Sequence, residues 1–111
     1  MTDSPLDLQA LDMLREVMED DFNLLIDTFI EDATLRLNRL KQHYTVMDID
    51  DIRREAHSLK GSSSNIGALG FSQLCFVLEE QCRNGSADGI EQRIKAMSSE
   101  FERVKKALSL L

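Results

Sequence analysis

His57 is the residue of this sequence whose neighbours most favour a chemical role. Lys60 follows it by three positions and Gly61 by four, so on a helix the three residues share one surface. An exposed imidazole with an unprotonated nitrogen is a nucleophile, and nearby positive charge favours that neutral form. An ammonium group beside it can stabilise a transferred phosphoryl group. The chemistry of these residues therefore fits a nucleophilic His57 that could take up a phosphoryl group with the assistance of Lys60.

Gly61 lies inside the same helical pattern, where a glycine costs about 1 kcal/mol relative to alanine. Such a residue on a surface is explained if another molecule must approach the backbone closely. The alternative is that the helix bends or frays at this point. Because the apolar pattern continues to Ile66, we favour close approach by a second protein.

The element that positions His57 is a helix expected at about residues 50–66. At ~100° per residue, its apolar positions fall within about 40° of one direction, and His57 falls about 140° away from it. These inner positions are Ile52, Ala56, Leu59, Ser63 and Ile66. The helical geometry therefore predicts that His57 faces solvent, with Arg53, Arg54 and Ser64 on the same outer surface. Arg53, Arg54 and Lys60 make this surface locally positive, although the whole chain has a net charge of -7. An ordinary solvated helix face also explains these cations.

The remaining chain shows the same helical spacing of apolar residues and no alternating strand pattern. The 111 residues fit one domain, spanning 1–111. We predict an all-α, antiparallel four-helix bundle with an additional short N-terminal helix. Ser4-Pro5 would open that short helix, and Glu19-Asp20-Asp21 would begin the next. The predicted inner residues of the short first helix are Leu8, Leu11, Leu14, Val17 and Met18. The predicted inner residues of the last helix run from Ile90 to Leu111.

Composition excludes several classes of function. A net charge of -7 disfavours nucleic acid and anionic membranes as partners. The chain has no transmembrane-length apolar run and no signal peptide at its start, which predicts a cytoplasmic protein with Cys75 and Cys82 as free thiols. No G-x-x-x-x-G-K loop occurs, so the phosphoryl donor must be another protein. We predict no bound metal, because Asp48, Asp50 and Asp51 suit helix capping better than an EF-hand.

The segment Ala56-His57-Ser58-Leu59-Lys60-Gly61-Ser62-Ser63-Ser64-Asn65-Ile66-Gly67-Ala68 resembles the signature of histidine-containing phosphotransfer (HPt) domains. The pairs Leu74-Cys75 and Leu78-Glu79 match two further parts of that pattern. The resemblance implies a phosphorelay intermediate of two-component signalling, in the form of a stand-alone bacterial protein. Such a protein is a phosphorylated carrier and not an enzyme that turns over a small substrate.

The resemblance also assigns roles to individual residues. His57 would accept a phosphoryl group from a receiver-domain aspartate of a hybrid sensor kinase and pass it to a response-regulator receiver. Lys60 would stabilise the phosphoryl group, and Gly61 would give the receiver access. Ser62 and Ser63 would be small packing residues, Ser63 also bonding a preceding carbonyl, and Gly67 would end the helix. The receiver would supply magnesium, and this chain would be a monomer without a cofactor of its own.

Phe76 is the candidate apolar docking residue, because it falls about 140° from the core direction of its helix. The alternative is that it packs under the preceding loop or the first helix. Gln81 is a weaker candidate for the same groove. One alternative function stays open, a helical adaptor that binds receiver domains without being phosphorylated.

Overall fold

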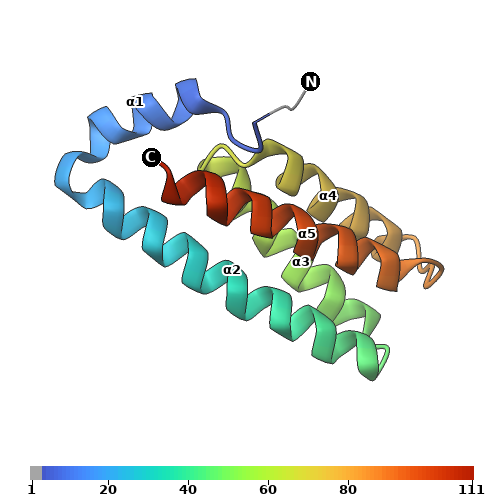
Figure 1. The fold of residues 1–111 in the computed structure, drawn as a ribbon. Helices are drawn as coiled ribbons and strands as arrows, with labels where there is room; N and C mark the ends of the chain where they lie inside the picture. The colour runs from blue at the N-terminus through green and yellow to red at the C-terminus, as the bar shows by residue number, and fades with distance from the viewer. Residues whose placement is uncertain (1–3) are drawn as a thin grey trace.

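The helices expected from the apolar spacing are all present in the computed structural model, which describes residues 4–111 (Figure 1). They are α1 (Leu8–Met18), α2 (Phe22–Thr45), α3 (Ile49–Asn65), α4 (Leu69–Arg83) and α5 (Ile90–Ser109), with a 3-10 turn, η1 (Glu19–Asp21), before α2. Each of the four long helices packs against two others, in the ring order α2, α3, α4, α5 and back to α2. The described residues contain no strand. The predicted four-helix bundle with a short first helix is confirmed.

The core lies where the predicted inner stripes of the four long helices meet. Phe101 of α5 contacts Phe29 of α2 and Phe71 of α4, with ring centroids 6.3 and 5.5 Å apart. All five predicted inner positions of the α3 stripe are buried, as are Ile90, Ile94, Met97, Phe101, Val104 and Leu108 of α5. Leu111 is the exception, because α5 ends at Ser109 and leaves Leu111 48% exposed. Burial of these side chains supplies most of the stabilising free energy, at roughly 1.5–3 kcal/mol for each large one.

The first helix lies at one end of the bundle and runs from the α3–α4 connection toward the start of α2 (Figure 1). It begins at Leu8 with Asp7 as its cap, later than the predicted opening at Ser4-Pro5. Leu11 is buried, but Leu8 and Val17 are 51% and 79% exposed, so the prediction of these two as inner residues was wrong. Because α1 lies at the end of the bundle, other helices cover it on one side only. Its apolar residues spread over a wider part of the helix surface than that contact covers.

Both ends of the histidine helix α3 are set by specific backbone contacts. Asp48 caps the N-terminus by accepting a hydrogen bond from the Asp51 backbone N–H, at 3.1 Å, as its acidic start predicted. Gly67 follows the C-terminus with a φ of +80°, which confirms its predicted role at the helix end. The Gly67 carbonyl also accepts a bond from the Asp7 N–H at 2.8 Å, which ties the segment before α1 to the end of α3.

No helix among residues 4–111 has both the length and the apolar character needed to cross a bilayer. Both cysteines are buried free thiols, as predicted. Burial raises the pKa of the Cys75 thiol to about 12.

Candidate functional site

His57 projects from α3 with 63% of its side chain exposed, which confirms that it faces solvent. Its Nδ1 lies 2.8 Å from Oε2 of Glu79 on the neighbouring helix α4. An ionised carboxylate can only accept hydrogen bonds, so Nδ1 must carry the proton in this contact. In the neutral ring, the lone pair is therefore on the other nitrogen, Nε2, which is the nitrogen available for nucleophilic attack.

Glu79 is 1% exposed and is held by cations as well as by the histidine. Lys60 Nζ lies 2.8 Å from Oε1, and an Arg83 terminal nitrogen lies 3.0 Å from Oε2. Burial acts to raise the pKa of the Glu79 carboxyl, but the hydrogen bonds from Lys60 and His57 outweigh it and the pKa is lowered. Glu79 is consequently ionised at neutral pH. One buried carboxylate thus orients both the imidazole and the ammonium group.

The sequence did not identify this role of Glu79, nor any role of Arg83. Glu79 was noted only as part of a leucine–glutamate pair, since nothing in the spacing joins residue 57 to residue 79. The available signal was the position of Glu79 on α4. It lies about 40° from the buried Cys75 around the helix, where a charged side chain needs a partner.

The cations near His57 are each paired with an acid, which corrects the expected excess of positive charge. Arg53 lies 3.8 Å from an Asp50 oxygen, and Arg54 lies 2.9 Å from an Asp51 oxygen. Both acids precede their arginine by one turn. Counting cations alone also omitted the carboxylate that contacts the imidazole directly.

A hollow of ≈ 620 Å³ opens beside Lys60 on the α3–α4 surface. Of the residues predicted to contact the receiver, Gly61, Ser64 and Phe76 line this hollow. Arg53 and Arg54 do not line it. Phe76 is 41% exposed, so the alternative of packing under the loop or α1 is wrong, and its ring centroid lies 5.5 Å from Lys60 Nζ. The full lining is Lys60, Gly61, Ser64, Asn65, Leu69, Ser72, Gln73 and Phe76.

Leu69 is an apolar residue of this hollow that sequence reasoning missed. It is 53% exposed at the first position of α4, and the hollow therefore has two apolar side chains, Leu69 and Phe76. The exposure of Leu69 was hard to predict from the sequence, because a single leucine beside a helix start is equally typical of the core.

Gly61 lies on an open surface within the hollow. A Cβ built at this position would find no atom within 4 Å outside the local helix backbone, so no internal packing requires glycine here. α3 continues without a break to Asn65, which excludes fraying as the explanation. The bare backbone at Gly61 is accessible to a second molecule, as the clearance hypothesis requires.

Three comparisons with known proteins agree with this geometry. A family model described as the Hpt domain matches residues 24–107. The chain belongs to the Hpt domain family. The crystal structure of histidine-containing phosphotransfer protein B (HptB) from Pseudomonas aeruginosa PAO1 superposes with a TM-score of 0.89 and 34% identity, covering 97% of this chain and 98% of that one. An Hpt domain is a phosphorelay intermediate of two-component signalling, and this is the function of the chain.

Plant proteins are similar at lower identity. Histidine-containing phosphotransfer protein 1 of Arabidopsis thaliana is 29% identical over 104 residues, which is 91% of this chain and 68% of that protein. The protein of the same name from Oryza sativa subsp. japonica is 28% identical and covers 84% of this chain. The Hpt chain spans 65% of the rice protein, so about two thirds of each plant relative is represented.

The small residues after Gly61 in the Hpt domain lie where predicted, with one correction. Ser63 is fully buried, but its Oγ has no hydrogen-bond partner among the described residues, so the predicted bond to a preceding carbonyl was wrong. Ser62 makes such a bond instead, donating to the Leu59 carbonyl at 3.3 Å. A serine hydroxyl reaches that carbonyl in only some rotamers, which sequence spacing does not specify.

Two polar side chains of α4 donate hydrogen bonds to backbone carbonyls outside the helix. Ser72 Oγ donates to the Lys60 carbonyl at 3.0 Å and so joins α4 to the histidine helix. Gln81 donates to the carbonyls of Ser86 and Asp88 in the α4–α5 connection. The weak prediction that Gln81 contacts the docking groove was therefore wrong.

Proposed function

We propose that His57 is the phosphorylated residue and that Nε2 is the atom that carries the phosphoryl group. The supporting observation is the contact between Nδ1 and the ionised, buried Glu79. It holds the ring proton on the inner side of an imidazole that is 63% exposed. The exposed ring then has its lone pair on Nε2 without any prior proton transfer.

The proposed step accepts a phosphoryl group from the aspartyl phosphate of a receiver domain. The Nε2 lone pair forms the bond to phosphorus while the phosphorus–oxygen bond to the aspartate breaks, and the aspartate leaves as a carboxylate. The imidazole gains positive charge while its proton stays on Nδ1, and the Glu79 carboxylate stabilises that charge. Lys60 is placed to stabilise the phosphoryl oxygens. The same atoms in reverse order pass the group to a second receiver aspartate.

The magnesium for this chemistry is proposed to come from the receiver. Mg²⁺ prefers oxygen ligands such as carboxylates. The carboxylate that contacts His57 is Glu79, and its two oxygens are engaged by Lys60, His57 and Arg83. These residues do not fit a magnesium site, so we derive no step through the metal on this chain. We propose a monomeric, cytoplasmic carrier whose phosphoryl chemistry is completed by the partner.

The receiver is proposed to dock over the hollow beside Lys60, one turn along α3 from His57. Gly61 and Ser64 are small residues that leave room for the receiver, and the exposed Phe76 and Leu69 provide apolar area. Arg53 and Arg54 stay predictions for the rim of the same contact. A buried apolar centre with charged residues at its edge is the usual arrangement in protein interfaces.

The test is transfer from a purified, phosphorylated receiver domain in the presence of Mg²⁺. We expect acid-labile label on the wild-type chain and none on His57→Gln. His43→Gln is the matched control, since it changes the second histidine, which lies on α2, and it is expected to accept label normally. If the wild-type chain binds the receiver but acquires no label, the adaptor function replaces this proposal.

A further inference from the structure

We propose that Phe76 is a positioning residue, which holds the Lys60 ammonium group where it can reach the transferred phosphoryl group. The Lys60 Nζ atom lies over the Phe76 ring, 5.5 Å from its centroid. The same Nζ lies 2.8 Å from Oε1 of Glu79, the carboxylate that contacts His57. This inference rests on the proposed phosphorylation of His57, and it gives Phe76 a role beyond receiver docking.

Two side chains of α4 hold Lys60 in place. Phe76 and Glu79 are three residues apart on that helix, so they share one face of it. A lysine side chain is flexible and loses conformational entropy when its ammonium group is confined. A cation within about 6 Å of an aromatic centroid is attracted by the negative face of the ring. The ring contact therefore offsets part of the entropy cost of keeping the Lys60 ammonium group near His57.

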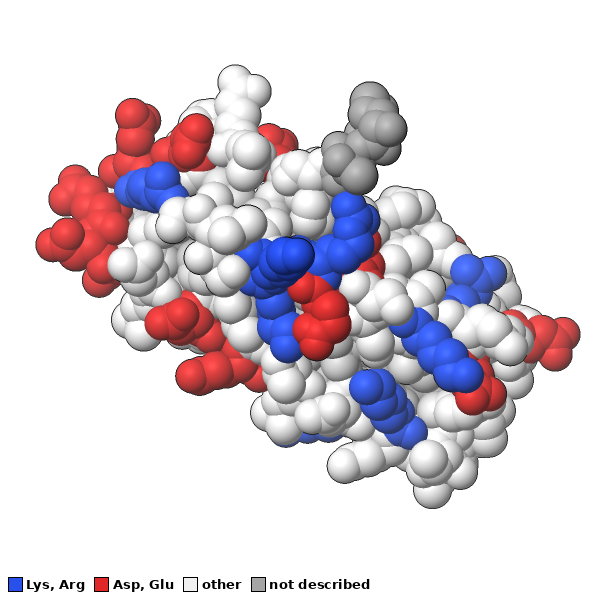
Figure 2. Space-filling view, viewed as in Figure 1, with Lys and Arg blue, Asp and Glu red and all other residues white. Residues whose placement is uncertain are grey.

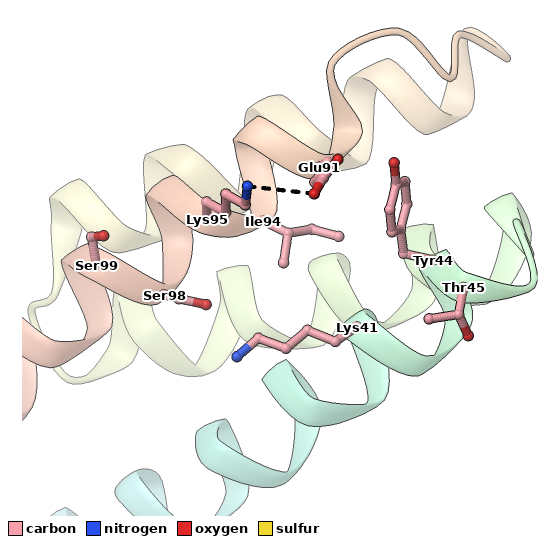
Figure 3. A pocket seen from close by; sticks show the side chains of 8 residues that line it. All are labelled: Lys41, Tyr44, Thr45, Glu91, Ile94, Lys95, Ser98 and Ser99. Carbon is pink, nitrogen blue, oxygen red and sulfur yellow. Dashed lines mark ion pairs between the residues drawn. The ribbon is translucent and has the colours of Figure 1, made fainter.

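Two lysines of α5 show what the spacing along one helix produces by itself. Lys95 lies 3.4 Å from an oxygen of Glu91, which precedes it by four residues (Figure 3). Lys105 lies 5.4 Å from the centroid of the Phe101 ring, which also precedes it by four. On the face seen in Figure 2, several other lysine and arginine side chains lie beside acidic ones. Lys60 differs because its ring and its carboxylate both belong to another helix, so its position depends on α3–α4 packing.

An aromatic ring suits this place better than a second carboxylate. The face of the ring is electron-rich but carries no net charge. A second acid beside Lys60 would repel the negatively charged phosphoryl group and compete for the N–H donors of the ammonium group. The three donors of Lys60 can turn toward phosphoryl oxygens while the ring contact persists. Phe76 thus positions the cation without neutralising it.

The same contact links receiver docking to phosphoryl transfer. Phe76 is partly exposed and lines the hollow over which the receiver is proposed to dock. A contact between a cation and a ring is weak in water and becomes stronger when both groups are desolvated. A docked receiver would cover the ring and exclude water from it. Lys60 is then held most firmly in the complex in which the phosphoryl group moves.

The experiment measures single-turnover transfer from a trace of labelled, phosphorylated receiver to increasing concentrations of the full chain. Phe76 is replaced site-specifically by phenylalanine derivatives with progressively more ring fluorines, which weaken the negative face and keep the shape of the ring. We expect the maximum rate to fall stepwise, by about fivefold in total, as the ring contact is lost. The half-saturating concentration should not rise, because the fluorinated ring stays apolar.

Three further variants separate positioning from docking. Phe76→Leu keeps an apolar side chain without a ring, and it should lower the maximum rate as far as the most fluorinated derivative does. Leu69→Ala is the matched control, because it removes apolar area from the same hollow and leaves the ring in place. It should raise the half-saturating concentration, which is the signature of docking alone. In a Lys60→Ala background, Phe76→Leu should cause no further fall in the maximum rate, since Phe76 acts through Lys60.

Any of three kinetic results would overturn the positioning role of Phe76. They are an equal maximum rate for every fluorinated ring, an equal fall in the maximum rate for Leu69→Ala and Phe76→Leu, and additive losses in the Lys60→Ala background. Proton NMR of the unphosphorylated chain tests the contact without any transfer. The Lys60 side-chain protons should shift in Phe76→Leu, because the ring current is lost, and unchanged shifts would overturn the contact itself. A wild-type chain that acquires no label refutes the His57 proposal, whereas normal labelling with unchanged rates refutes this inference alone.

Discussion

Replacing Glu79 by glutamine removes one negative charge from a 1% exposed side chain while keeping its size. The carboxylate has three partners, and their side chains differ in exposure: 30% for Lys60, 55% for Arg83 and 63% for His57. Contacts to exposed partners are screened by water, so Lys60 dominates the energetic effect. Hydrogen bonds to charged groups contribute about 1.5–3 kcal/mol, and the amide keeps only weaker ones. We expect Glu79→Gln to lose about 2 kcal/mol of unfolding free energy, or about 8 °C in melting temperature.

The stability effect of Glu79→Gln should depend on pH. The pKa of Glu79 is lowered from its ordinary value of 4.5, so the folded state binds fewer protons here than the unfolded state. The contribution of Glu79 to stability is then fully present above about pH 4.5 and is lost as the pH falls through the folded pKa. Urea unfolding of both proteins at several pH values should show their difference narrowing at acid pH. A constant difference at every pH would refute the ionised, buried carboxylate.

The chemical effect of Glu79→Gln follows from the tautomer of His57. A glutamine can present its NH₂ group to Nδ1, which must then accept, and the ring proton moves to Nε2. We expect the rate of transfer from a phosphorylated receiver to fall about tenfold or more. Nitrogen NMR shifts of His57 report the tautomer directly. Glu80→Gln is the control, since Glu80 contacts Arg83 but not His57. A Glu79→Gln variant with unchanged tautomer and unchanged transfer rate would refute the positioning role.

Three other substitutions test separate parts of the site. Gly61→Arg should leave the circular dichroism spectrum and melting temperature unchanged, because a Cβ there meets nothing within 4 Å, yet abolish transfer; normal transfer would contradict the clearance argument. Ser63→Ala removes a buried hydroxyl without a partner and should leave stability unchanged or raise it by up to about 1 kcal/mol, whereas a clear loss in urea unfolding would reveal a hidden bond. Gly67→Ala should cost about 1–3 kcal/mol, because φ is +80° and the new Cβ would lie 3.3 Å from the Asp7 carbonyl; an unchanged melting temperature would refute that strain.

The sequence predicted the bundle and the exposure of His57 because both follow from helical periodicity. Ile52, Ala56 and Leu59 define the buried direction of α3, and the angle of His57 follows from it by counting residues. The contact with Glu79 could not be obtained in this way. It joins two helices whose relative rotation and translation are set by packing of the whole core. The same reason explains the Ser63 error, since a rotamer depends on neighbours that spacing does not describe.

The buried carboxylate connects the stability of the bundle to the reactivity of the histidine. His57 and Lys60 lie on α3, whereas Glu79 and Arg83 lie on α4, so the ring is oriented only when these two helices are packed in register. The Ser72–Lys60 hydrogen bond and the buried Phe71 hold α4 in that register. Gly61, one turn along α3 from His57, leaves the neighbouring surface bare. Substitutions that loosen α3–α4 packing far from His57 should therefore slow transfer through the imidazole orientation, even when the receiver still binds.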